Sequence, residues 1–404
     1  MQSFRGLDDL DPGGKRILLR LDLNVPLKDG QVSDDSRIRR SLASVLDLAR
    51  RGGRVIILSH LGRPAGADPA LSLRPVATAL ERCLRAAGYD RPVAFAADCI
   101  GAAAQAAVAA LGDGDVLLLE NLRFHKGEEA NATDFTAALA RLGEIWVMDA
   151  FSAAHRAHGS TAGLAAYLPA FAGRLMAEEL AALNRVLATP ERPLAAVIGG
   201  AKVSSKIDVL RYLVERVQVL VIGGAMANTF LLARGHAIGR SLAEPDLVDV
   251  ARDIERRARE GGGDLLLPDD VVVAPGLDRG NAAATVKIDQ VPAAAMILDF
   301  GVASAARLCA SLADWRTLVW NGPLGAFEHR PFDQATLAFA RAVAQRTRDG
   351  ALVSVAGGGD TVAALNAAGV SADLSYVSTA GGAFLEWLEG RTLPGVAALA
   401  AAAR

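Results

Sequence analysis

The chain has 404 residues, of which 51% are hydrophobic and 22% are charged, and its formal net charge is -2. This length exceeds the size at which one hydrophobic core usually stops growing, so two domains are expected, and the composition is typical of a compact soluble protein. A near-neutral charge argues against binding to nucleic acid or to a membrane surface, where a basic excess is expected.

The cysteines also limit the possibilities. Cys83, Cys99 and Cys309 are widely spaced and include no CxxC pair, which indicates a reducing compartment and no structural zinc. The first eleven residues, MQSFRGLDDLD, carry acids and have no apolar core, unlike a secretory signal or a transit peptide. The alanine-rich runs are too short or interrupted for a membrane span. We therefore expect a cytoplasmic protein.

Short apolar runs alternate with Ala-, Leu- and Arg-rich stretches of helical period along the whole chain. Gly, Asn, Asp or Ser follows these runs, which is the pattern of parallel strands covered by helices. In the first half the expected strands are residues 17–21, 55–58, 93–95, 116–119 and 145–148. In the second half they are residues 194–198, 219–222, 265–267, 296–298, 318–320 and 352–355. Both halves are therefore predicted to be α/β, as Rossmann-like three-layer domains with parallel sheets.

A helix is expected to join the two halves. Residues 171–187 have apolar positions at helical spacing, and the sequence TPERP that follows contains two prolines, which end a helix and begin a new unit. We predict an N-terminal domain over residues 1–170, a hinge helix over 171–189 and a C-terminal domain over 190–385.

Four segments of the second half place glycines directly after an apolar run and before an expected helix: AVIGGAKV, LVIGGAMA, SVAGGGDT and YVSTAGGAF. In open α/β sheets ligands bind outside the carboxyl ends of the strands, where glycine lets the backbone approach and the next helix presents free N–H groups. A tight turn explains any single glycine of this kind, but four in one half favour a phosphate or nucleotide site. Asp360 fits a magnesium ligand there, and a helix cap explains it about equally well.

Four motifs of the first half follow or end expected strands: RLDLNVP at residues 20–26, SHLGRP at 59–64, ENLRFH at 120–125 and DAFSAAHRAH at 149–158. They place acidic, basic and amide side chains on one rim. A small ligand with a carboxylate and a phosphate requires planar, permanently charged groups that donate paired hydrogen bonds. The guanidinium group of arginine supplies them, and the ammonium group of lysine does not. A single arginine without this context would be a solvated surface charge.

Together with Arg37, these motifs resemble the substrate cradle of the phosphoglycerate kinase family. The second half agrees in order, because its segments are similar to the nucleotide motifs of that family: GGAKVSSKI at 199–207, GGAMANTF at 223–230, WNGPLGAFE at 320–328, GGGDT at 357–361 and VSTAGGA at 377–383. The resemblance covers the whole chain in sequence order.

The resemblance implies a role for each matching residue. The site for 3-phosphoglycerate or 1,3-bisphosphoglycerate would consist of Asp22, Asn24, Arg37, His60, Arg63, Arg123 and Arg156. The site for ADP or ATP would consist of Gly200, Ala201, Lys206, Gly224, Asn321, Pro323, Glu328, Gly357, Gly358, Gly359, Asp360 and Thr361, with Asp360 as the ligand of Mg²⁺. The residues implied to act on the transferring phosphoryl group are Arg37, Lys202, Gly358 and Gly381.

By the same resemblance, the reaction is a reversible in-line phosphoryl transfer from 1,3-bisphosphoglycerate to ADP, with no covalent phosphoenzyme. The hinge helix would close the domains and exclude water. Residues 386–404 would return to the first domain, and a monomer is expected. The sequence leaves open the resting state of the hinge, the choice between ADP and GDP, and whether the enzyme serves glycolysis, gluconeogenesis or carbon fixation.

Two other functions fit parts of the pattern. A catalytically silent nucleotide or metabolite sensor on the same fold should lack some of Arg37, Lys202, Lys206 and Asp360, and all four are present. A nicotinamide-dependent dehydrogenase should carry GxGxxG, which is absent, as is the P-loop motif GxxxxGK[ST].

Several residues have a simpler interpretation than a site. His155 and His158 are spaced as helical neighbours, but no third ligand stands at a zinc-like spacing. Glu128 and Glu129 are interpreted as a solvated charge run. Five residues depart from the family pattern without removing a charge, which leaves the local loop geometry and the nucleotide affinity open: Met148, Ser152, Ala153, Ala225 and Ala380.

Overall fold

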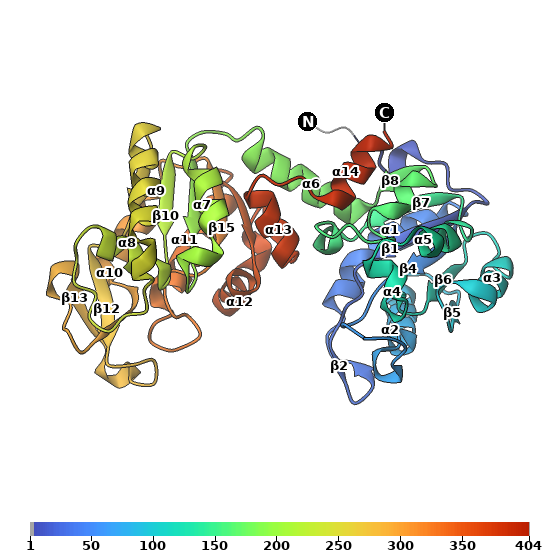
Figure 1. The fold of residues 1–404 in the computed structure, drawn as a ribbon, viewed down its shortest axis with the longest axis horizontal. Coiled ribbons are helices and arrows are strands. Elements are labelled where there is room, and N and C mark those ends of the chain that lie inside the picture. The colour runs from blue at the N-terminus through green and yellow to red at the C-terminus, as the bar shows by residue number, and fades with distance from the viewer. Residues whose placement is uncertain (1–3, 404) are drawn as a thin grey trace. The chain divides into compact units, whose positions relative to one another are not determined.

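The computed structural model describes residues 4–403, so residues 1–3 of the N-terminal segment and Arg404 of the predicted C-terminal segment lie outside it. The chain divides into two compact units (Figure 1): Met1–Leu180 together with Thr392–Arg404, and Ala181–Arg391. None of the helices in the described part is both long enough and apolar enough to cross a bilayer.

The first unit is built on a six-stranded parallel sheet in the order β5-β6-β4-β1-β7-β8. Its strands are β1 (Arg16–Leu21), β4 (Arg54–Leu58), β5 (Val93–Ala96), β6 (Val116–Leu119), β7 (Ile145–Asp149) and β8 (Ala170–Ala172), and a small hairpin pairs β2 (Leu27–Lys28) with β3 (Gln31–Val32). Its helices are α1 (Ser36–Arg50), α2 (Arg74–Ala86), α3 (Gly101–Ala109), α4 (Lys126–Glu129), α5 (Thr133–Ala140) and α14 (Pro394–Ala401). Every residue of β6 and β7 is buried, as expected of parallel strands covered on both faces.

The second unit repeats this architecture with the order β11-β10-β9-β15-β16-β17. Its parallel strands are β9 (Leu194–Ile198), β10 (Val219–Ile222), β11 (Asp264–Leu266), β15 (Thr317–Asn321), β16 (Val353–Gly357) and β17 (Tyr376–Ser378). Its helices are α7 (Ile207–Val214), α8 (Met226–Ala233), α9 (Val248–Glu260), α10 (Val302–Ser311), α11 (Gln334–Arg348), α12 (Gly359–Ala368) and α13 (Gly381–Leu388). The predicted α/β class with parallel sheets is therefore confirmed.

Two predicted segments take a different form. Residues 296–298 belong to β14 (Met296–Phe300), which pairs antiparallel with β12 (Asp270–Ala274) in a separate three-stranded sheet completed by β13 (Ala284–Lys287). The expected parallel pairing was wrong because an apolar run does not reveal its partner. The predicted helix 171–187 also begins later, because Phe171 pairs with Val147 as part of β8.

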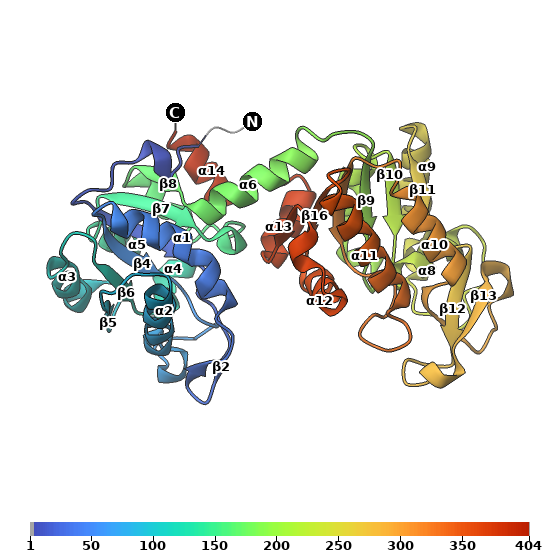
Figure 2. The same ribbon diagram turned by 180° about the vertical axis from the view of Figure 1, so that it is seen from behind.

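The connecting helix α6 (Arg174–Leu187) begins in the first unit and ends in the second (Figure 2). Its first turn is held in the first unit, where Asp149 Oδ1 accepts a hydrogen bond from Met176 N at 2.8 Å and Ser44 Oγ accepts one from Arg174 N at 2.8 Å. The chain returns to the first unit at Thr392, and α14 packs against β8 there.

Candidate active site

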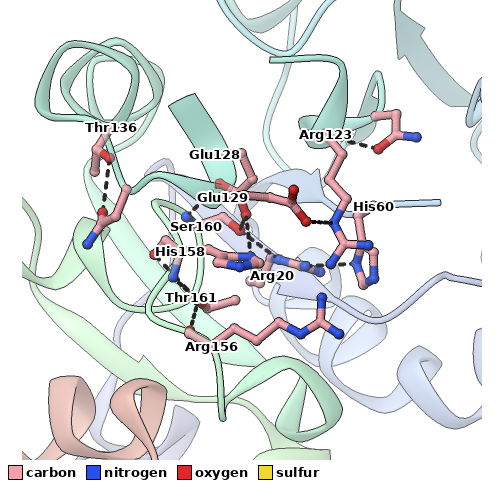
Figure 3. Close-up of polar contacts among 12 residues, drawn as sticks. Arg20, His60, Arg123, Glu128, Glu129, Thr136, Arg156, His158, Ser160 and Thr161 are labelled. Atoms are coloured by element: carbon pink, nitrogen blue, oxygen red, sulfur yellow. Dashed lines mark hydrogen bonds and ion pairs between the residues drawn. The ribbon is translucent and has the colours of Figure 1, made fainter. Parts of the chain in front are cut away.

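The carboxyl ends of the central strands in the first unit bring basic side chains together (Figure 3). Arg20, at the end of β1, is buried; its Nε donates to Ser160 Oγ at 2.8 Å and its Nη2 to His60 Nδ1 at 3.0 Å. Arg123 follows β6 and donates from Nη1 to the Gly62 carbonyl at 2.6 Å. The Arg156 side chain extends toward the same group in Figure 3. Four motifs far apart in sequence thus meet in one basic pocket.

The histidines of this pocket are uncharged. Burial, followed by the positive charge of Arg20, holds the pKa of His60 well below its usual range. Because His60 Nδ1 accepts from Arg20, the proton of the neutral ring is on Nε2, which is left as a donor. Burial, followed by the charge of Arg123, lowers the pKa of His158 to about 4. The pocket therefore combines permanent cations with neutral donors, which suits an anion.

A second group of predicted residues surrounds Asp22. Its Oδ2 accepts from Arg37 Nη1 at 2.6 Å and from Ser152 Oγ at 2.5 Å. Its Oδ1 accepts from Asn24 N at 3.2 Å, and Asn24 Oδ1 in turn accepts from Gly62 N at 2.9 Å. Ser152, a departure from the family pattern, thus contacts a predicted substrate residue directly.

Two predicted arginines differ in exposure. Arg37 stands in the first turn of α1 and is half-buried beside Asp22. Arg63 is exposed on the loop after β4, and among the described residues it makes no hydrogen bond or ion pair. Its charge still contributes to lowering the pKa of Arg123, for which burial is the main cause. Arg63 therefore lies near the basic pocket with its guanidinium open to solvent.

In the second unit, a cavity of about 290 Å³ lies at the carboxyl ends of the strands, near the lower end of the range for small-molecule sites. Six predicted nucleotide residues line it: Gly200, Ala201, Gly224, Pro323, Glu328 and Asp360. Most of the remaining wall is apolar, as required for a base or another flat ring.

Most of the other predicted nucleotide residues form a hydrogen-bonded group beside Asp360. Asn321 Oδ1 accepts from Lys206 Nζ, and its Nδ2 donates to the Gly357 carbonyl at 2.7 Å. Gly358 has φ +98°, and a Cβ there would lie 2.6 Å from Asn321 Nδ2, so only glycine fits this turn. Burial lowers the pKa of Lys206 to about 8, although Asp360 opposes the shift.

Three further predicted residues have free space next to them. Lys202 is exposed before a short 3₁₀ turn, and within the described part of the chain only its carbonyl takes part in a hydrogen bond, from Ser205 Oγ at 2.8 Å. Gly359 and Gly381 begin α12 and α13, and a Cβ on either would meet none of residues 4–403 within 4 Å. The space above both helix starts is therefore free for a ligand to approach the backbone N–H groups.

The comparisons with known proteins agree with this geometry. The model of the family described as phosphoglycerate kinase matches residues 7–391. The chain belongs to this family. It is 57% identical over 404 residues to the phosphoglycerate kinase of Rhizobium leguminosarum bv. trifolii, and 57% identical over 405 residues to that of Methylorubrum populi, with 100% of each chain covered in both cases.

Solved structures give the same result. The structure of phosphoglycerate kinase from Coxiella burnetii matches with a TM-score of 0.92 and 42% identity, covering 100% of both chains. That from Pyrococcus horikoshii matches with a TM-score of 0.81 and 30% identity, covering 99% of both. The predicted family and kinase activity are confirmed, and nothing in these matches favours the silent sensor.

One prediction about residues of the basic pocket was wrong. Glu128 is not part of a solvated charge run, because it is only 1% exposed and accepts from Ser160 Oγ at 2.6 Å and from Ser160 N at 2.9 Å. Burial raises its pKa, while Arg20 opposes that shift. Glu129 alone is solvated, and it pairs with Arg123 at 3.1 Å. Sequence spacing cannot show which face of the short helix α4 turns inward.

Sequence reasoning also missed residues that build the two pockets. Arg20 lies inside the motif RLDLNVP and Ser160 lies just after DAFSAAHRAH, but neither was assigned a role. In the second unit, Asp299 lines the cavity and is 2% exposed, and burial raises its pKa to about 8. The isolated acid in the apolar run MILDF was the signal that could have identified it.

Another group of metal-type donors lies outside both pockets. The donor atoms of Asp98, Cys99 and His125 lie within 4.8 Å of one another, and Asp98 Oδ1 contacts His125 Nε2 at 2.7 Å. These residues follow β5 and β6, so the sheet and not the sequence spacing brings them together. His155 and His158 do not belong to this group.

Proposed function

We propose that this chain catalyses the reversible transfer of a phosphoryl group from 1,3-bisphosphoglycerate to ADP, giving 3-phosphoglycerate and ATP. The observation that carries the proposal is the pocket of Arg20, Arg123, Arg156 and His60, assembled from four separate segments of the first unit. Permanent cations and neutral histidines can bind a small phosphorylated carboxylic acid. Membership of the phosphoglycerate kinase family indicates that this acid is 3-phosphoglycerate.

Within this pocket, Arg63, Arg123 and Arg156 would bind the phosphate with His60 donating from Nε2. Asp22 and Asn24 would orient the hydroxyl and carboxyl end of the triose. Asp22 is already positioned by hydrogen bonds from Arg37 and Ser152, so its carboxylate is held before the substrate arrives. Preorganised groups of this kind lower the cost of ordering a ligand.

The second unit would bind the nucleotide, with the base among the small residues 199–201, 223–225 and 323–324. Glu328 would hold the ribose, and Lys206, Asn321 and the N–H groups of residues 357–359 with Thr361 would bind the phosphates. Asp360 stands in the first turn of α12 beside these amides, so its carboxylate oxygens fit the hard ligands that Mg²⁺ prefers. When bound, Mg²⁺ would neutralise phosphate charge.

The chemistry would require positioning and charge stabilisation rather than acid catalysis. The leaving group of the acyl phosphate is a carboxylate, a weak base that needs no general acid. The charge on the three equatorial oxygens would be stabilised by Arg37, Lys202 and the N–H groups of Gly358 and Gly381. The two ligands would be held by separate units, so we further propose that bending within residues 171–189 brings them together. We also propose that the protein is a monomer in the cytoplasm.

One assay tests the function. Purified protein with 3-phosphoglycerate and Mg-ATP should form 1,3-bisphosphoglycerate, which added glyceraldehyde-3-phosphate dehydrogenase reduces while NADH absorbance falls. We expect turnover on the order of 1–100 s⁻¹, the usual range for kinases. A silent sensor would bind Mg-ADP without any change in NADH. Absence of turnover in protein that still binds Mg-ADP would overturn the proposal.

A further inference from the structure

Asp299 is the one ionisable residue buried in the apolar wall of the nucleotide cavity, among the described residues that line it. It stands in β14 between Leu298 and Phe300, which also line the cavity. Both of its oxygens are occupied: Oδ1 accepts from Phe300 N at 2.9 Å, and Oδ2 accepts from Ala335 N at 3.0 Å. Ala335 lies in the first turn of α11, so Asp299 joins this helix to β14.

The segment 322–326 is packed between the same two elements. Gly325 lies against Asp299 so closely that a Cβ on Gly325 would be 2.1 Å from Asp299 Oδ1. Ala326 N donates to the Leu298 carbonyl at 2.8 Å, and Leu324 N donates to Thr336 Oγ1 on α11 at 3.0 Å. The position of this segment therefore depends on β14 and α11 staying together.

The segment 322–326 is part of the ligand cavity. Pro323, Leu324, Gly325 and Ala326 all line it, as do Phe327 and Glu328, which follow. A cavity wall made of backbone and small side chains keeps its shape only if residues behind it fix that shape. Asp299, which is 2% exposed, lies against this segment at the edge of the cavity.

We propose that Asp299 is a positioning residue for nucleotide binding: it fixes the segment 322–326 so that the affinity for the nucleotide depends on it while the rate of phosphoryl transfer does not. This inference rests on the proposed nucleotide site in the second unit. Asp299 acts through the segment and needs no contact with the phosphates, which the residues around Asp360 would bind.

The chain contains a matched control for this arrangement. Asp270 begins β12 in the same three-stranded sheet, and its two oxygens accept from Ser304 N at 2.6 Å and from Ala303 N at 3.1 Å in the first turn of α10. A Cβ on Gly301 would lie 2.2 Å from Asp270 Oδ2. The pair Asp270 and Gly301 therefore repeats the pair Asp299 and Gly325, but neither residue lines the cavity.

The experiment compares Asp299→Ala with Asp270→Ala in the full chain. For Asp299→Ala we expect the KM for Mg-ATP to rise about tenfold, which corresponds to about 1.4 kcal/mol, while kcat and the KM for 3-phosphoglycerate stay within about twofold. Asp299→Asn, which keeps the size and one acceptor, should recover part of the affinity. Asp270→Ala should leave the KM for Mg-ATP unchanged. An equal rise of the KM for Mg-ATP in both alanine variants would indicate general destabilisation and would overturn the inference.

A second pair of variants and a binding measurement keep the inference testable if Asp299→Ala does not fold. Gly325→Ala should displace the segment 322–326 and raise the KM for Mg-ATP, whereas Gly301→Ala should not. Calorimetric titration with Mg-ADP reports affinity without turnover, so an inactive wild-type chain would overturn the proposed function separately. Variants of Asp299 and Gly325 that bind Mg-ADP as tightly as the wild type would overturn the inference.

Discussion

Replacing Glu128 by glutamine should destabilise the first unit strongly. The Glu128 carboxylate accepts two hydrogen bonds from Ser160 and is the main opposite charge for buried Arg20, followed by Asp22. Glutamine can accept one of the two bonds and carries no charge. Removing one partner of a buried pair costs about 3–5 kcal/mol. Because Asp22 still compensates Arg20 in part, we expect the lower end, about 3 kcal/mol of unfolding free energy.

The neighbouring residue supplies the control. Glu129 has a side chain that is 54% exposed, so water screens its ion pair with Arg123 although the Arg123 side chain is only 5% exposed, and such a screened pair is worth about 1 kcal/mol at most. Glu129→Gln should therefore change the unfolding free energy by less than about 1 kcal/mol. The two substituted residues are adjacent in the sequence, but only Glu128 is buried.

Urea-dependent hydrogen exchange measured by mass spectrometry can follow the first unit by itself, through peptides from β1 and β7. For Glu128→Gln the urea midpoint of these peptides should fall, while peptides from β9 and β15 in the second unit keep theirs. Equal midpoints for the Glu128 and Glu129 variants, or a loss below about 1 kcal/mol at Glu128, would refute the burial argument.

Four further results are expected. Arg37→Ala should lower kcat about a hundredfold by removing a charge donor, while Arg39→Ala, on the exposed side of α1, should keep kcat in the same coupled assay. Mg-ADP affinity should fall as pH rises through about 8, where Lys206 loses its charge, and Lys206→Arg should remove this dependence in calorimetric titrations at pH 7 and 9. Asp360→Asn should raise the Mg²⁺ concentration for half-maximal activity about tenfold, and an unchanged requirement would exclude Asp360 as its ligand. Burial raises the pKa of Asp149 to about 6, so the folded state binds this proton more tightly; its contribution to stability is present below about pH 4 and is lost as pH rises through 6. That loss is on the order of 3 kcal/mol, and urea unfolding of Asp149→Asn should not show it.

Much of the candidate site could be predicted because its residues lie at the carboxyl ends of strands. The motifs that contain Arg20, His60 and Arg123 each follow an apolar run, and parallel strands end at one edge of a sheet. The glycines before α12 were predictable for the same reason. Domain limits were less visible: the division within α6, after Leu180, leaves no mark in a continuous helical pattern.

The sequence by itself determined the α/β class, the family and the residues expected to meet the ligands, because apolar periodicity and local motifs depend on neighbours along the chain. Only the tertiary structure decided that Glu128 is buried while Glu129 is solvated, and that β14 leaves the parallel sheet. It alone placed Asp299 between β14, α11 and the segment 322–326. Burial and strand pairing are set by segments distant in sequence, so no local pattern encodes them.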